Sequence, residues 1–131
     1  MNAPSRCSAY ALGAVACLAV FLIGAKPHGG DPGQGKALYE KICTGCHSLD
    51  ANRTGPMHRG VYGRKAGSVP DFGYSDALKN SGVVWNEATL NRWLSGPENF
   101  IPGQKMNVAV EDPKSREDII AYLKSVSPGA K

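Results

Sequence analysis

The chain has 131 residues, of which 42% are hydrophobic and 20% are charged, and it carries 15 Lys and Arg against 11 Asp and Glu. This length suits a single domain, and the ordinary charged fraction excludes both a largely disordered chain and a membrane protein with several spans. The net charge of +4 favours acidic protein surfaces or anionic lipid as partners, but it is too small and too scattered to predict binding to nucleic acid.

Residues 7–25 form an uncharged apolar segment that follows Arg6 and the amino terminus. A positive flank followed by an apolar run is typical of an export signal. The segment is longer than the core of most cleaved signals, about 7–15 residues, and as long as the shortest membrane-spanning helices, about 17–25. We therefore expect residues 1–25 to be a signal peptide, cut after Ala25, or an N-terminal membrane anchor. Both alternatives predict that the rest of the chain is exported.

Three segments are expected after this leader: a Gly/Pro-rich linker at residues 26–34, one domain at residues 35–127 and a short tail at residues 128–131. The sixteen Gly and nine Pro of the whole chain predict many loops and only three or four short helices. The predicted helices begin at Asp31-Pro32, Ser75, Asn86 and Asp112-Pro113, and the third is halted by Gly96-Pro97. Only residues 83–85 resemble a strand, so the expected fold class is all-α.

Residues 43–47 read Cys-Thr-Gly-Cys-His, which is a C-x-x-C-H motif. Two thiols at this spacing can add to the two vinyl groups of a haem, and the histidine then lies under the iron as an axial ligand. Half of a zinc site and a thioredoxin-like redox pair are the alternatives. A zinc site needs a second pair of ligands, but Cys7 and Cys17 lie in the leader. A redox pair needs a strand-helix context, whereas a helical segment precedes this motif.

An iron held by His47 has either a sixth ligand or an open position. Two methionines lie beyond the leader, Met57 and Met106. Met106 follows a Pro-Gly loop far along the chain, and such a loop can cover the opposite face of a haem and present a thioether. Core filling is the alternative role for a methionine, and the residues alone leave both roles open.

Ordered blocks of sequence resemble the class I cytochrome c family, in its mitochondrial-type branch with bacterial members, over residues 33–126. The blocks are Gly35 and Tyr39 before the C-x-x-C-H motif, Gly55-Pro56 after it, residues 60–67, 72–77 and 82–85, then Leu90, Leu94, Pro97 and residues 102–106, and finally residues 116–124. The resemblance implies the class I cytochrome c fold, with three to four short helices around one covalently bound haem c. It also implies a one-electron carrier rather than an enzyme.

The same resemblance implies how the haem is held. Thioether bonds would join it to Cys43 and Cys46, and His47 and Met106 would be the axial ligands of the iron. The carbonyl of Pro56 would accept a hydrogen bond from the second ring nitrogen of His47, which would orient the ring.

Three further residues match family positions that hydrogen-bond around the haem propionates: Arg64, Tyr74 and Trp85. Buried carboxylates need donors nearby, and a cation, a hydroxyl and an indole supply them. Core packing is a second role for Trp85, and the two roles are compatible.

Several residues depart from the family pattern near the proposed Met106 ligand. Gln104 stands where relatives usually have Thr, Trp93 where they usually have Tyr, and Leu78 where many have Asn, so the polar network at this ligand must differ. Val108 replaces an aromatic residue that packs beside the haem edge. His58 replaces a leucine that touches the haem, and it could be a rival ligand or a histidine at the rim.

Charge around the haem edge also differs from the family. Relatives carry lysines there, but this chain has Ile42, Glu98 and Asn99 at such positions, which predicts weaker ionic steering toward acidic partners. The acidic residues form no paired motif, and we interpret them as solvated surface charges: Asp71, Asp76, Glu87 and Glu98.

These features together predict an exported, monomeric, monohaem electron carrier of a respiratory or related chain. Its expected partners are a cytochrome bc-type donor and a terminal oxidase or reductase. It would act on the periplasmic side of a bacterial inner membrane, either soluble after cleavage or anchored by residues 7–25. The alternative is a haem enzyme or a gas or redox sensor in which the methionine ligand is labile or absent.

The predicted helices are too short to enclose a large core, so the haem itself must complete it. We therefore expect the haem-free chain without its leader to be poorly folded. Far-UV circular dichroism of that chain should show little helix. A strong helical signal would contradict this expectation.

Overall fold

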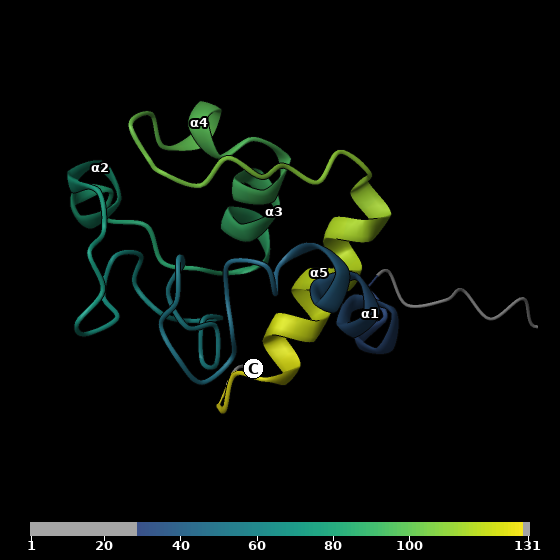
Figure 1. Ribbon diagram of the computed structural model, residues 1–131. Coiled ribbons are helices and arrows are strands. Elements are labelled where there is room, and N and C mark those ends of the chain that lie inside the picture. Colours follow the sequence, from purple (N-terminus) through teal and green to yellow (C-terminus); the bar gives the residue numbers. More distant parts are fainter. Residues whose placement is uncertain (1–28, 130–131) are drawn as a thin grey trace, which may run out of the picture.

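The computed structural model describes residues 29–129. It contains α1 (Pro32–Ile42), α2 (Asp76–Asn80), α3 (Glu87–Ser95), α4 (Pro97–Phe100) and α5 (Pro113–Ser125). Figure 1 shows α1 and α5 together on one side of the molecule and α2 on the other, with α3 and α4 between them and long loops joining the parts. The described residues form no strand, only an isolated antiparallel bridge between Lys65 and Val84. The predicted all-α class is thus confirmed.

The leader, residues 1–25, lies outside the described residues, as do residues 26–28 of the predicted linker. Residues 32–34, which we placed in that linker, form the first turn of α1. Between residues 29 and 129, none of the helices combines the length and the apolar character that crossing a membrane requires.

The helices begin where short polar side chains satisfy the free N–H groups of a first turn. Asp31 accepts from the backbone N–H groups of Gly33 and Gln34 at the start of α1. Asn86 and Thr89 form a reciprocal capping box at α3. Asp112 accepts from Ser115 N–H at α5. These helix starts are confirmed, because each depends only on residues within one turn.

One short helix was missed by the sequence analysis. We interpreted Gly96-Pro97 as the stop of the preceding helix, which it is, but Pro97 also occupies the first position of α4. The fixed φ of proline suits that position, and its missing N–H would have no partner there in any helix. The same pair of residues therefore ends α3 and begins α4.

The packing of α1 against α5 depends on a glycine. A Cβ built on Gly35 would lie 1.8 Å from the backbone oxygen of Asp118, so the two helices meet backbone to backbone at this point. On the same interface the rings of Tyr39 and Tyr122 lie 5.2 Å apart, and Ile119 is completely buried. The chain thus closes its first helix onto its last.

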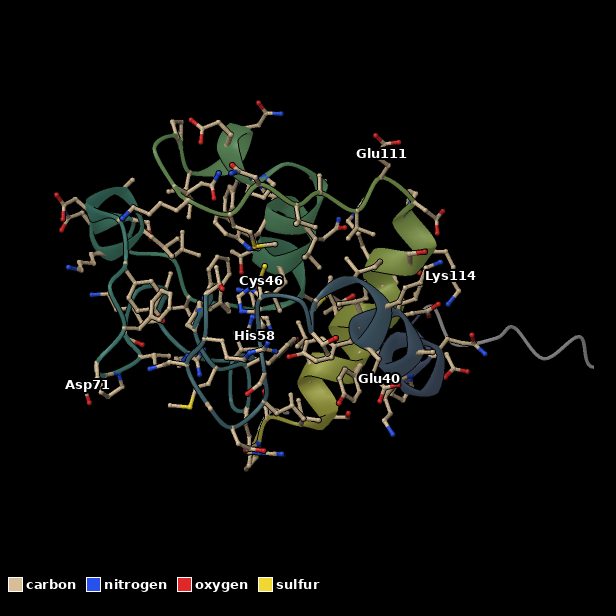
Figure 2. All side chains as sticks on the ribbon, viewed as in Figure 1. Glu40, Cys46, His58, Asp71, Glu111 and Lys114 are labelled. Atoms are coloured by element: carbon tan, nitrogen blue, oxygen red, sulfur yellow. The ribbon has the colours of Figure 1, made fainter. Side chains whose placement is uncertain are left out.

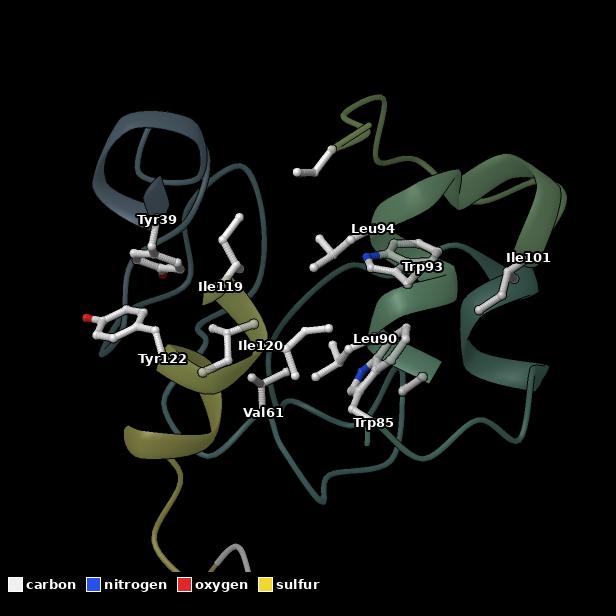
Figure 3. Packing of buried hydrophobic residues seen from close by; sticks show 13 residues of the cluster. Tyr39, Val61, Trp85, Leu90, Trp93, Leu94, Ile101, Ile119, Ile120 and Tyr122 are labelled. Carbon is white, nitrogen blue, oxygen red and sulfur yellow. The ribbon is translucent and has the colours of Figure 1, made fainter. Parts of the chain in front are cut away.

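A second group of buried side chains surrounds α3 (Figure 3). Leu90, Trp93 and Leu94 all lie on one face of that helix and are buried, as the predicted spacing required. Trp85 packs against Trp93 with ring centroids 5.4 Å apart. Both groups belong to one core cluster, so α3 and the α1–α5 pair are held as a single unit.

The close contact at Gly35 predicts that adding one methyl group there lowers the stability of the protein strongly. Gly35→Ala should lower the free energy of unfolding of the folded protein by about 3 kcal/mol, because the backbone oxygen at 1.8 Å cannot rotate away. Denaturation by guanidinium chloride measures this difference.

Gly33→Ala is the matched control on the same helix. Its added Cβ would meet only the Asp31 side chain, at 3.1 Å, so stability should change by less than about 1 kcal/mol. Equal losses in the two variants would show that the close approach of the helices is unimportant.

Candidate functional site

The C-x-x-C-H residues form a tight turn at the end of α1. The backbone N–H of Cys43 donates to the Tyr39 carbonyl at 2.8 Å, and those of Cys46 and His47 donate back to the Cys43 carbonyl at 3.1 and 2.9 Å. The turn therefore carries two thiols and an imidazole within five residues. Figure 2 shows Cys46 and His58 near the middle of the molecule in this view.

The thiol of Cys43 does not have the properties of a reactive nucleophile. Cys43 is partly buried, and this burial raises the pKa of its thiol to about 11. Catalytic thiols instead have lowered pKa values, because the thiolate is the nucleophile. Residues 29–129 also bring together no group of three or more His, Cys, Asp or Glu side chains that could hold a metal ion, whereas a structural zinc site uses four ligands.

The ring of His47 is fixed in one tautomer. Its Nδ1 lies 2.8 Å from the Pro56 carbonyl oxygen, which can only accept, so Nδ1 carries the proton and donates. Nε2 then has a free lone pair. Burial lowers the pKa of His47, which favours the neutral imidazole that binds metals. The turn of residues 43–47 thus carries one unprotonated ring nitrogen and two thiols.

Gly55 makes this arrangement of the ring possible. A Cβ at Gly55 would lie 2.2 Å from Cε1 of His47, so any larger residue would push the ring away. The Gly55 backbone N–H also donates to the Cys46 carbonyl at 2.8 Å, which ties this loop to the turn of the two cysteines.

The ring of His58 packs directly on the ring of His47. The two rings are stacked, with centroids 3.9 Å apart and planes inclined by 20°. Its Nδ1 lies 3.1 Å from the Tyr39 hydroxyl. Burial, with further contributions from His47 and Arg64, holds the pKa of His58 well below its usual value. Nothing in the spacing of the sequence indicated this stack, since its two rings come from separate turns.

Arg64 is a partly buried cation without a carboxylate partner among the described residues. Its guanidinium donates to the carbonyls of Met57, at 2.8 Å, and Arg59, at 3.1 Å. Burial lowers the pKa of Arg64, and the nearby Tyr74 opposes this shift. A bound carboxylate would compensate the buried charge.

Tyr74 and Trp85 lie close to this cation. The Tyr74 hydroxyl accepts from Val69 N–H at 3.4 Å, which leaves its own proton free to donate. The Trp85 backbone N–H donates to the Arg64 carbonyl at 2.9 Å, and only 6% of Trp85 is exposed. The guanidinium of Arg64 and the hydroxyl of Tyr74 are thus donors that could pair with a carboxylate of a bound group.

Met106, which is far from the C-x-x-C-H residues in the sequence, packs on the core. Its side chain is partly buried against the main cluster. On its other side, an open groove of about 230 Å³ is lined by Pro97, Glu98, Gln104, Met106 and Val108, among others. The groove thus lies between residues 96–99 and the loop of Met106.

Comparison with known proteins gives matches over the same region. The family model described as cytochrome c matches residues 33–127. Cytochrome c of Euglena viridis is 45% identical over 100 residues, which are 74% of this chain and 98% of that protein. Cytochrome c2 of Rhodomicrobium vannielii is 45% identical over 98 residues, which are 72% of this chain and 78% of that one. The structure of cytochrome cH from Methylobacterium extorquens aligns with a TM-score of 0.70 at 43% identity, covering 73% of this chain and 99% of that one.

The contact between Gly55 and His47 yields a prediction. Gly55→Ala should break the hydrogen bond to Pro56 and destabilise the haem-loaded protein by about 1–3 kcal/mol, with a shift in its midpoint potential, because the ring must move. Guanidinium unfolding and a redox titration measure the two effects.

Gly45→Ala is the control within the same turn, because no atom lies within 4 Å of its added Cβ. It should leave the midpoint potential unchanged. A potential that is the same in the Gly55 variant and the parent would mean that the glycine does not position the ring.

Proposed function

This chain belongs to the cytochrome c family, and on that premise we propose that Cys43, Cys46, His47 and Met106 hold its haem. Members of this family have the class I fold, carry one covalent haem c and transfer electrons rather than catalyse a reaction on a substrate. Electron carriage is therefore the activity that the site has to perform. The observation that carries the assignment of residues is the His47–Pro56 hydrogen bond beside the two thiols.

The side chains around the proposed haem have separate tasks. Haem iron, when bound, supplies a one-electron couple between the ferric and ferrous states. Cys43 and Cys46 would fix the haem in place through thioether bonds. His47 would offer Nε2, and its hydrogen bond to Pro56 would orient the ring and make it more basic. The soft thioether of Met106 would favour the ferrous state and raise the potential.

Arg64, Tyr74 and Trp85 are proposed to hold the propionates. The partly buried guanidinium of Arg64 and the free hydroxyl proton of Tyr74 support this role, since both can donate to a carboxylate. Pairing these carboxylates with donors would offset the free-energy cost of burying them.

His58 is not suited to be the sixth ligand. A ring stacked on the proposed axial imidazole lies beside that imidazole, whereas a sixth ligand must approach the iron from the opposite direction. The stack thus supports Met106 over His58 as the second axial ligand.

We also propose that the protein is exported, with residues 1–25 as a signal peptide or membrane anchor, and that it acts in a respiratory or related chain. The uncharged apolar segment behind Arg6 supports export. The family implies redox proteins as partners. A cytochrome bc-type donor and a terminal oxidase or reductase are the proposed ones, on the periplasmic side of a bacterial inner membrane.

Optical spectra with carbon monoxide test the role of Met106. The parent protein should show a weak long-wavelength band from sulfur to ferric iron and should not respond to carbon monoxide when reduced. Met106→Ala should lose the band and bind carbon monoxide, because it opens the iron.

Met57→Ala is the matched control and should keep the band. A parent that lacks the band and binds carbon monoxide would favour the sensor alternative, in which the methionine is labile or absent.

A further inference from the structure

Glu98 and Gln104 meet at the loop that carries Met106. The Glu98 carboxylate accepts from the backbone N–H of Gly103 at 3.0 Å and from Nε2 of Gln104 at 3.2 Å. The other end of the same amide, Oε1 of Gln104, accepts from the backbone N–H of Met106. Two hydrogen bonds thus connect α4 to Gly103 and Gln104, and a third connects Gln104 to Met106. Our interpretation of Glu98 as a solvated charge overlooked this link.

The chemistry of the three contacts requires a glutamine between a carboxylate and an N–H group. A carboxylate can only accept, so the amide must turn its NH₂ group toward Glu98 and its oxygen toward Met106. Threonine, the usual family residue at position 104, has a single oxygen on its Cβ. Both partners would then have to reach one atom, so this link needs the longer side chain of Gln104.

The rest of the loop gives Met106 limited support. Gly103 adopts a positive φ of 87°, and the Gln104 N–H donates to the Ile101 carbonyl at 3.2 Å, so the turn itself is tight. The groove of about 230 Å³, however, leaves one side of the loop open to solvent. Hydrogen bonds to α4 therefore restrain the loop on the side where packing does not.

We propose that Glu98 and Gln104 form a clamp that positions Met106 for the iron and opposes its displacement by other ligands. The proposal rests on the proposed role of Met106 as an axial ligand. Both residues act through the backbone of the loop and are therefore positioning residues. The bonds to the carboxylate are charge-assisted, but Glu98 is exposed, so we expect a moderate effect.

Exchanging the two side chains tests the clamp. In Glu98→Gln alone, the new side chain has one accepting oxygen and one donating NH₂ group, but both of its neighbours, Gly103 N–H and Gln104 Nε2, are donors. One of the two hydrogen bonds to position 98 is therefore lost. Gln104→Glu alone places two carboxylates face to face. The double variant E98Q/Q104E can form all three bonds again, because the new amide accepts from Gly103 N–H and donates to the new carboxylate, which accepts from Met106 N–H.

The measurement is the affinity of the oxidised, haem-loaded protein for imidazole, which competes with Met106. Each single variant should bind imidazole about tenfold more tightly than the parent, and the double variant should return to within about twofold of it. Amide hydrogen exchange at Met106 provides a second readout that does not depend on the iron, and it should be faster in the single variants only. Glu87→Gln, which removes the same charge from the first turn of α3, should behave as the parent.

The outcomes separate the clamp from the proposed ligand. Met106→Ala should bind imidazole tightly whatever stands at positions 98 and 104. If the parent binds imidazole as tightly as Met106→Ala, Met106 is not a ligand, and the proposed function fails together with the clamp. If the parent resists imidazole but the single variants match it, or if the double variant is no better than the single ones, the clamp alone is overturned.

Discussion

The hydrogen bond from Nδ1 of His47 to the Pro56 carbonyl determines what the rest of the site can do. It fixes the proton on one ring nitrogen and leaves the other free, and it joins the end of α1 to the loop that follows the C-x-x-C-H motif. Gly55 permits the approach because it has no side chain, and the stacked ring of His58 covers the imidazole. One backbone carbonyl thus sets the tautomer, the orientation and the surroundings of the proposed ligand.

The geometry of that hydrogen bond depends on where α1 lies, because His47 follows α1 directly. The position of α1 depends in turn on its packing against α5. Gly35 lets the two helices meet at backbone distance, and Tyr39 serves both regions, since its ring packs on Tyr122 and its hydroxyl lies 3.1 Å from His58. Tyr39 therefore connects the interface between α1 and α5 to the proposed haem site. The loop of Met106 packs against the core cluster and is also tied by hydrogen bonds to Glu98 of α4.

Features that depend on residues near one another in the sequence, such as helix caps, could be predicted from the sequence. Contacts between segments that only the folded chain brings together were missed. Asp31, Asn86 and Asp112 cap the helices they were expected to cap, because a cap reaches no further than the next turn. The helix α4 was missed because Pro97 follows a stop signal. The contacts of His58 and Glu98 were also missed, since a ring stack between two turns and a carboxylate that bonds around a tight loop follow no helical or strand period. The contact of His47 with Pro56 could be inferred only from the resemblance to a family.

The pairing of the first helix with the last has a consequence for biosynthesis. The turn with Cys43 and Cys46 follows α1 directly, yet α1 has no partner until α5 has left the ribosome and, for an exported chain, the translocation channel. Until then the two thiols belong to an unfolded, accessible segment. The cysteines proposed to bind haem would thus be reached before α1 closes onto α5, and because we expect the haem-free chain to be poorly folded, they would stay accessible until the haem is attached.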